Sequence, residues 1–96
     1  MKEFIVIYHG HQTPTPEVEA AWNDWVQRRA ASFSEVGHAF GPGRQITNDG
    51  TIEWSLSTNQ ASGYSIVIAP HIDAAEQLLN GCPFVDSISL YEALPT

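Results

Sequence analysis

The stretch Gly63–Pro83 constrains the fold of this chain most, because it combines a strand, a turn, a short helix and a stop. Its first part, Tyr64–Ala69, is aromatic, β-branched or small without polar alternation, which is typical of a strand covered on both faces. Pro70 cannot donate a ladder hydrogen bond and ends that strand. A helix is then predicted from about Ile72 to Asn80, and the Gly-Cys-Pro that follows stops it.

The first third of the chain repeats this plan. Phe4–Tyr8 is a second strand with apolar side chains on both faces. After a loop, Thr15 is a suitable N-cap and Pro16 suits the first helical position. The helix is predicted to run to about Glu35, with Gly37 as its terminator. One broad apolar face of it would carry Val18, Trp22, Trp25, Val26, Phe33 and Val36.

The remaining segments predict further strands. His38–Thr47 reads as a strand that bends at Gly41–Gly43. Asn48–Gly50 is a turn signal, and Thr51–Leu56 is its expected hairpin partner. A last strand is predicted over Ser87–Ala93. The fold class is therefore α+β, in the order βα, ββ, αβ.

This order implies an assembly. Two helices cover only one face of a four-stranded sheet, yet three of the predicted strands are apolar on both faces. The uncovered face would be an apolar patch larger than a monomer tolerates. The pattern therefore predicts a homodimer in which sheet packs against sheet and buries at least about 1,600 Å² in total.

Composition limits the partners and the location that are expected for this protein. The 96 residues fit one domain, 1–96, and the net charge of −7 argues against nucleic-acid and anionic-membrane partners. Cys82 is the only cysteine, so an internal disulfide is excluded. Met1–Glu3 shows no signal-peptide pattern, and no apolar run approaches the roughly 20 residues of a membrane span. A cytoplasmic location is expected.

Several short motifs extend over essentially the whole chain: Phe40–Gly43, Asp49–Gly50, Gly63–Ile66, Asp73–Ala75, Gly81–Pro83 and Ser89–Glu92. Together they resemble the YCII-related family, which includes the DGPF group. The resemblance implies a ferredoxin-like βαββαβ domain with an antiparallel sheet that pairs into a dimeric α+β barrel. Relatives in that superfamily include cofactor-free monooxygenases, isomerases and a lyase, so no cofactor is expected.

The chain departs from the family at two places. Catalytic members of the YCII type use a His–Asp pair with the His on or near the first helix, but Pro16–Val36 contains no histidine. Asp49–Ile52 also reads Asp-Gly-Thr-Ile rather than Asp-Gly-Pro-Phe. Both departures favour a noncatalytic module.

His9 and His11 are the most interesting pair of residues. Side chains two apart in an extended chain face the same way, so the two imidazoles could bind a metal. No third ligand is evident in the sequence, and no metal site is predicted. A general acid–base role suits them better, because imidazole titrates near neutral pH. Asp49 matches the acidic member of the family pattern and could orient a His, but Asp before Gly is also a common turn residue.

Three further side chains are candidates for ligand binding. Arg44 could meet a carboxylate, with a surface ion pair as the alternative. Trp22 could line a cavity, although Trp at helical spacing is more often core. His38 follows a predicted helix end and could instead interact with the helix dipole.

Two functions follow from these residues. The first is a noncatalytic dimeric binding or interaction module. The alternative is a small-molecule enzyme that uses His9 or His11 with Asp49 in the cleft between helices and sheet. The enzyme requires the His and Asp side chains to meet, directly or through one water.

Overall fold

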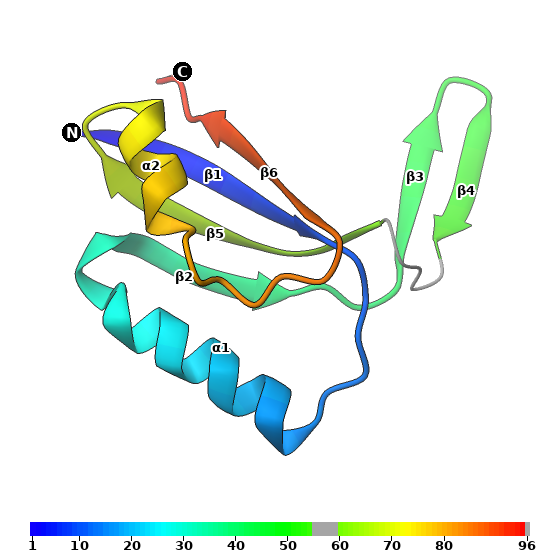
Figure 1. Cartoon of the computed structure of the whole chain (residues 1–96). Coiled ribbons are helices and arrows are strands. Elements are labelled where there is room, and N and C mark those ends of the chain that lie inside the picture. The colour runs from blue at the N-terminus through cyan, green and yellow to red at the C-terminus, as the bar shows by residue number, and fades with distance from the viewer. Residues whose placement is uncertain (55–59, 96) are drawn as a thin grey trace.

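The computed structural model describes residues 1–54 and 60–95. Four strands form an antiparallel sheet in the order β2-β5-β1-β6, and two more form a separate hairpin (Figure 1). The fold is α+β, as predicted. Its elements are β1 (Lys2–His9), α1 (Pro16–Arg28), a 3-10 turn η1 (Ala30–Ser32), β2 (Phe33–Ala39), β3 (Gly43–Thr47), β4 (Gly50–Trp54), β5 (Ala61–Ala69), α2 (Ile72–Leu78) and β6 (Ser87–Glu92).

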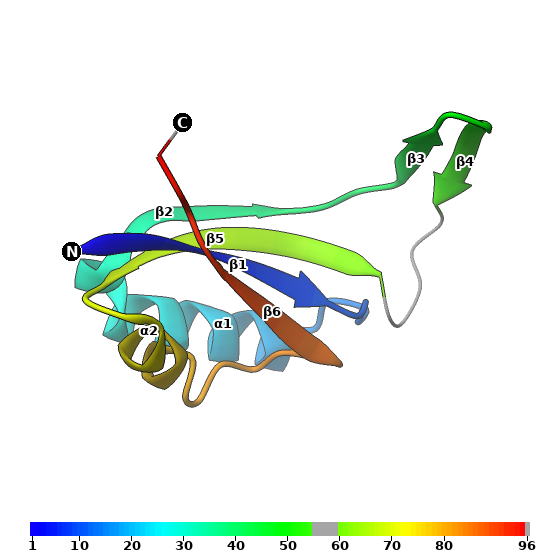
Figure 2. The ribbon, with the colours of Figure 1, turned by 90° about the horizontal axis from the view of Figure 1, so that it is seen from above.

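Both helices lie on one face of the sheet and leave the other face open (Figure 2). The alternation along β1 reflects this, since Phe4, Val6 and Tyr8 are buried beneath the helices. Ile5 and Ile7 point to the opposite face and are only half-buried in the single chain. The core on the covered side consists of Phe4, Val6, Tyr8, Trp25, Val67, Ala69, Ala75 and Cys82.

The first helix begins where the sequence predicts and ends earlier. The Thr15 hydroxyl accepts a hydrogen bond from the Val18 N–H, and Pro16 occupies the first turn. The predicted end near Glu35 is wrong, because α1 stops at Arg28 and the chain turns into β2 at Phe33. Phe33 still meets Trp25 edge-on, with ring centroids 5.5 Å apart, but from a strand. Pairing with β5 overrides the helical periodicity there.

Gly37 is not a helix terminator but lies in the middle of β2. Its φ of +87° falls in the left-handed region, at a position where the pairing between β2 and β5 shifts register. A Cβ there would lie 1.8 Å from the Tyr64 carbonyl O, so only glycine fits this approach. His38 therefore also lies in the strand and not beyond a helix end.

The predicted strand over 38–47 divides into two strands of different sheets. β2 ends at Ala39, and β3 begins at Gly43 after a short connection. The turn at Asn48 and Asp49 is confirmed, and β4 ends at Trp54. The last residues of the predicted partner strand, 55 and 56, lie outside the described residues. The hairpin stands away from the main sheet on the side that the helices leave open (Figure 2).

The second helix follows its sequence signals closely. It spans Ile72–Leu78, with the His71 ring accepting a hydrogen bond from the Ala74 N–H as its N-cap. Gly81 has the expected positive φ, +82°. Arg29 ties the end of α2 to the end of α1, because its guanidinium donates to the carbonyl O of Leu78 at 3.1 Å and of Asn80 at 3.3 Å.

Candidate functional site

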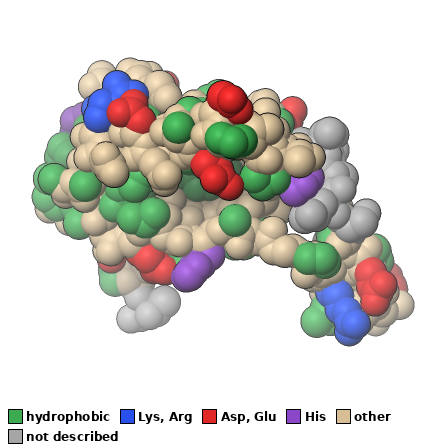
Figure 3. Space-filling model, turned by 90° about the horizontal axis from the view of Figure 1, so that it is seen from below, with side chains coloured by type: hydrophobic (Ala, Val, Ile, Leu, Met, Phe, Trp, Pro, Cys, Tyr) green, Lys and Arg blue, Asp and Glu red, His purple; other side chains and the backbone are tan. Residues whose placement is uncertain are grey.

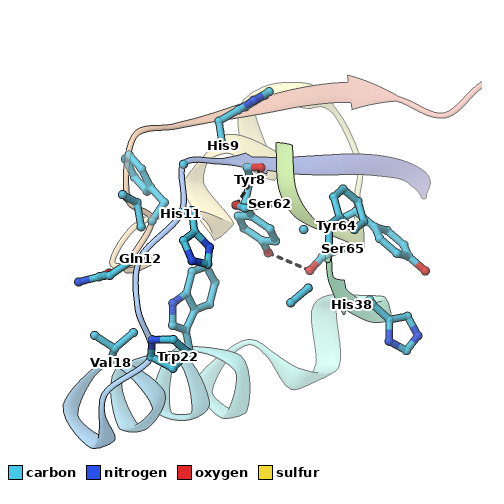
Figure 4. A pocket seen from close by; sticks show the side chains of 18 of the residues that line it. Tyr8, His9, His11, Gln12, Val18, Trp22, His38, Ser62, Tyr64 and Ser65 are labelled. Atoms are coloured by element: carbon cyan, nitrogen blue, oxygen red, sulfur yellow. Dashed lines mark hydrogen bonds between the residues drawn. The ribbon is translucent and has the colours of Figure 1, made fainter. Parts of the chain in front are cut away.

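A half-open cavity of about 520 Å³ lies between α1 and the covered face of the sheet. The loop from Gly10 to Pro14 closes one side of it, and Phe84 and Val85 flank it before β6. Its lining is mostly apolar and aromatic, and its size lies within the usual range for small-molecule pockets. Figure 4 shows Tyr8, Trp22 and His11 gathered in it from β1, α1 and the loop between them.

The aromatic wall of this cavity is ordered by edge-on contacts. The rings of Tyr8 and Trp22 have centroids 5.1 Å apart and an interplanar angle of 85°. Trp22 in turn meets the buried Trp25 at 5.9 Å. Such contacts hold large side chains in single positions, so the Trp22 face of the cavity is preformed.

A short chain of hydrogen bonds forms the polar part of the cavity wall. Tyr8 Oη lies 2.8 Å from Ser65 Oγ (Figure 4), and Ser65 Oγ lies 2.5 Å from the carbonyl O of Val36. The three residues come from β1, β5 and β2, so the register of the sheet brings them together. Tyr8 and Ser65 are buried, with exposed fractions of 8% and 3%.

Burial raises the pKa of the Tyr8 phenol to about 12. Burial also raises the pKa of the Cys82 thiol to about 12. Both groups are therefore neutral at pH 7. A neutral, buried thiol is a poor nucleophile, and Cys82 instead packs in the core.

These two groups predict a loss of stability at alkaline pH. The unfolded chain ionises Cys and Tyr near pH 9 and 10, whereas the folded chain keeps both protons until about pH 12, so the stability they confer falls as pH rises through this window. We expect the free energy of unfolding to drop by roughly 2 kcal/mol or more between pH 9 and pH 11. Urea melts of the wild type and of Tyr8→Phe, each at several pH values, would measure this drop. An equally steep loss of stability in the double variant Tyr8→Phe, Cys82→Ala would contradict the prediction.

The two predicted histidines do not share a face. His9 ends β1 and points away from the cavity (Figure 4), with Nε2 2.8 Å from Ser89 Oγ on β6. Gly10 then turns the chain with a φ of +99°, which breaks the two-residue alternation, and His11 lies against the cavity instead. Among residues 1–54 and 60–95 no cluster of three or more His, Cys, Asp or Glu side chains could hold a metal ion.

Asp49 lies in the turn of the β3–β4 hairpin and does not line the cavity. Its backbone N–H donates to the Thr47 hydroxyl, which is the turn role that was the alternative for this residue. Within one chain, the structure therefore does not bring Asp49 to His9 or His11.

Arg44 also lies on the hairpin, where its guanidinium contacts the Glu53 carboxylate at 3.4 Å. Both side chains are largely exposed, and Figure 3 shows basic and acidic side chains together on the projecting hairpin. Such an exposed pair contributes little to stability. Arg44 borders a second groove with Phe40 and Trp54 at the base of the hairpin.

Of the other predicted residues, Trp22 lines the cavity, while His38 lies at its rim beside Tyr64. Tyr8 and Ser65 were not among the predicted site residues, because each lies within a predicted strand. The signal for them in the sequence is that both are polar positions within otherwise apolar runs. Their contact joins positions 57 apart in the chain, which sequence periodicity does not report.

Comparison of the chain with protein-family models and with curated proteins found no match. None of the described helices has the length and apolarity needed to cross a membrane. The cavity and its chemistry are thus the basis for a functional argument.

Proposed function

We propose that this protein is a homodimeric, YCII-related module that binds a small molecule in the cavity between α1 and the sheet. The observation that carries the proposal is the half-open, largely apolar cavity of about 520 Å³ with the buried hydroxyls of Tyr8 and Ser65 in its wall. Apolar pockets with a few placed polar groups are the usual form of a ligand site.

A ferredoxin-like βαββαβ arrangement is part of this proposal. Leaving the β3–β4 hairpin aside as an insertion, the remaining elements follow the order βαββαβ. The four strands are antiparallel, and β1 and β5 occupy the centre of the sheet. This order supports the resemblance that the motifs indicate.

The open face of the sheet supports the homodimer. Register pairs Ile5 with Ile66 and Ile7 with Tyr64 across β1 and β5, so these side chains form one continuous apolar surface. No described helix covers it (Figure 2). A second copy of the same face is self-complementary, which is the requirement of a two-fold dimer.

The charges around the cavity favour binding over acid–base catalysis by a His–carboxylate pair. Glu19 is the one acidic residue among the described residues that line the cavity, and Asp49 lies on the hairpin. Within one chain, the predicted His–Asp49 pair therefore does not form in the cavity, because the Asp49 carboxylate does not line it. We therefore place the function in ligand binding.

A blocked cavity tests the proposal. Val18 lines the cavity from α1, and Val18→Trp is expected to fill it and to weaken binding of an uncharged aromatic fragment by at least about tenfold. Binding would be followed by amide chemical shifts of the ¹⁵N-labelled protein during titration with a set of such fragments.

Ile72→Trp is the matched control, because Ile72 is 49% exposed on α2 and does not line the cavity. It should bind the same fragments as the wild type. Fragments that shift no residue of the cavity in the wild type, or that bind Val18→Trp equally well, would rule out the proposed site.

A further inference from the structure

The direction of the hydrogen bonds in the cavity wall follows from counting protons. A carbonyl oxygen only accepts, so the Ser65 hydroxyl donates its single proton to Val36 O, 2.5 Å away. Ser65 Oγ then has no proton for Tyr8 and can only accept from it across 2.8 Å. The Tyr8 hydroxyl is therefore the donor in that bond.

This arrangement leaves Tyr8 Oη as an acceptor toward the cavity. Its proton is committed to Ser65, while its lone pairs have no hydrogen-bond donor among the described residues. The phenol keeps its proton at neutral pH because burial raises the pKa of Tyr8 to about 12. A buried acceptor without a donor costs free energy, which a ligand that supplies a donor would recover.

The charge of the surroundings narrows the ligand further. Neither Lys nor Arg occurs among the described residues that line the cavity. Its lining includes Glu19, one of the eleven acidic residues behind the net charge of −7, and three histidines, which that net charge counts as neutral. An anionic ligand would meet no Lys or Arg side chain in this lining, which is unfavourable. The edge-on rings of Tyr8 and Trp22 offer apolar contact to a flat molecule.

Resting on the proposed binding function, we infer that the ligand is an uncharged, largely apolar molecule with an O–H or N–H group that donates to Tyr8 Oη. A molecule of the same shape that only accepts would place two acceptors against each other. The Tyr8–Ser65–Val36 chain thus selects donors, and Ser65 acts as a positioning residue that fixes the Tyr8 proton.

Indole and benzofuran provide the test, because they share one bicyclic shape and only indole has an N–H donor. We expect the wild type to bind indole about fivefold or more tightly than benzofuran, in line with one hydrogen bond. Tyr8→Phe should reduce this preference to less than about twofold. Dissociation constants would come from chemical-shift titrations of cavity residues, including the Trp22 indole N–H.

Ser65→Ala provides an independent variant, since it keeps the Tyr8 hydroxyl but frees its proton. This variant should gain affinity for indanone, whose carbonyl only accepts, while its preference for indole over benzofuran falls. A merely structural role of Ser65 would weaken the binding of both ligands alike.

Equal binding of indole and benzofuran to the wild type, or a preference for indole retained in Tyr8→Phe, would overturn the inference that the ligand donates to Tyr8 and would leave the binding site standing. No cavity shifts with either ligand or any fragment would overturn the binding function itself.

Discussion

Ile7→Lys is expected to convert the proposed homodimer into folded monomers. Ile7 lies near the middle of the open face, between Tyr64 on β5 and Ser89 on β6 in the register of the sheet. A lysine there would place an unpaired charge in the apolar interface of both protomers. An uncompensated buried charge costs about 3–5 kcal/mol, so the dissociation constant should rise at least about a thousandfold.

The monomer should still fold, because Ile7 is only half-buried in a single chain and a lysine stem can reach water. Light scattering coupled to size exclusion would measure the assembly, and circular dichroism would confirm folding. Ile72→Lys is the control, since Ile72 is 49% exposed on the helical side and should leave the dimer intact. A wild type that is monomeric at micromolar concentration, or an Ile7→Lys variant that remains dimeric, would contradict an interface on this face.

Gly37→Ala is expected to lower the free energy of unfolding by at least about 3 kcal/mol. The φ of +87° is strained for any residue with a Cβ, and that Cβ would lie 1.8 Å from Tyr64 O and 2.7 Å from Tyr64 C. Both obstacles are backbone atoms of the neighbouring strand, so β2 would have to separate from β5. Because a domain of this size has a total stability of roughly 5–15 kcal/mol, the variant should melt far below the wild type.

Gly43→Ala is the matched control for this prediction. Gly43 has no positive φ, and a Cβ there would meet no atom within 4 Å. The free energy of unfolding of Gly43→Ala, measured by urea melts, should therefore stay within about 0.5 kcal/mol of the wild type. Equal stability of Gly37→Ala and Gly43→Ala would show that β2 does not approach β5 in this way.

The features that the sequence predicted correctly depend on local interactions, whereas the end of α1 depends on pairing with a distant strand. Local signals were sufficient for the Thr15 N-cap, for the turn at Asn48 and Asp49, and for the positive φ of Gly81. Each depends on hydrogen bonds or backbone dihedrals within a few residues. The end of α1 was not predictable in this way, because Phe33 and Val36 continue the helical apolar spacing and yet lie in β2, the strand that pairs with β5.

The candidate site shows the same division. The sequence identified Trp22 and His11, which lie in the cavity, but grouped them with His9, whose side chain points away from it, and with Asp49, which does not line it. The pairing of His9 with His11 failed because a single left-handed residue, Gly10, ends the alternation of β1 between them. The prediction that His9 and His11 face the same way assumed an extended chain across Gly10, and it is wrong for that reason.

The sequence by itself determined the α+β class, the two strand–helix units and the excess of apolar strand faces over helices that could cover them. These properties follow from side-chain periodicity, turn residues and composition, which are local or additive. Only the tertiary structure decided that Tyr8, Ser65 and Val36 meet, because their contact depends on the register of three strands that are distant in the chain. Register sets which side chains share a face and a level of the sheet, and the polarity of the cavity depends on that alignment.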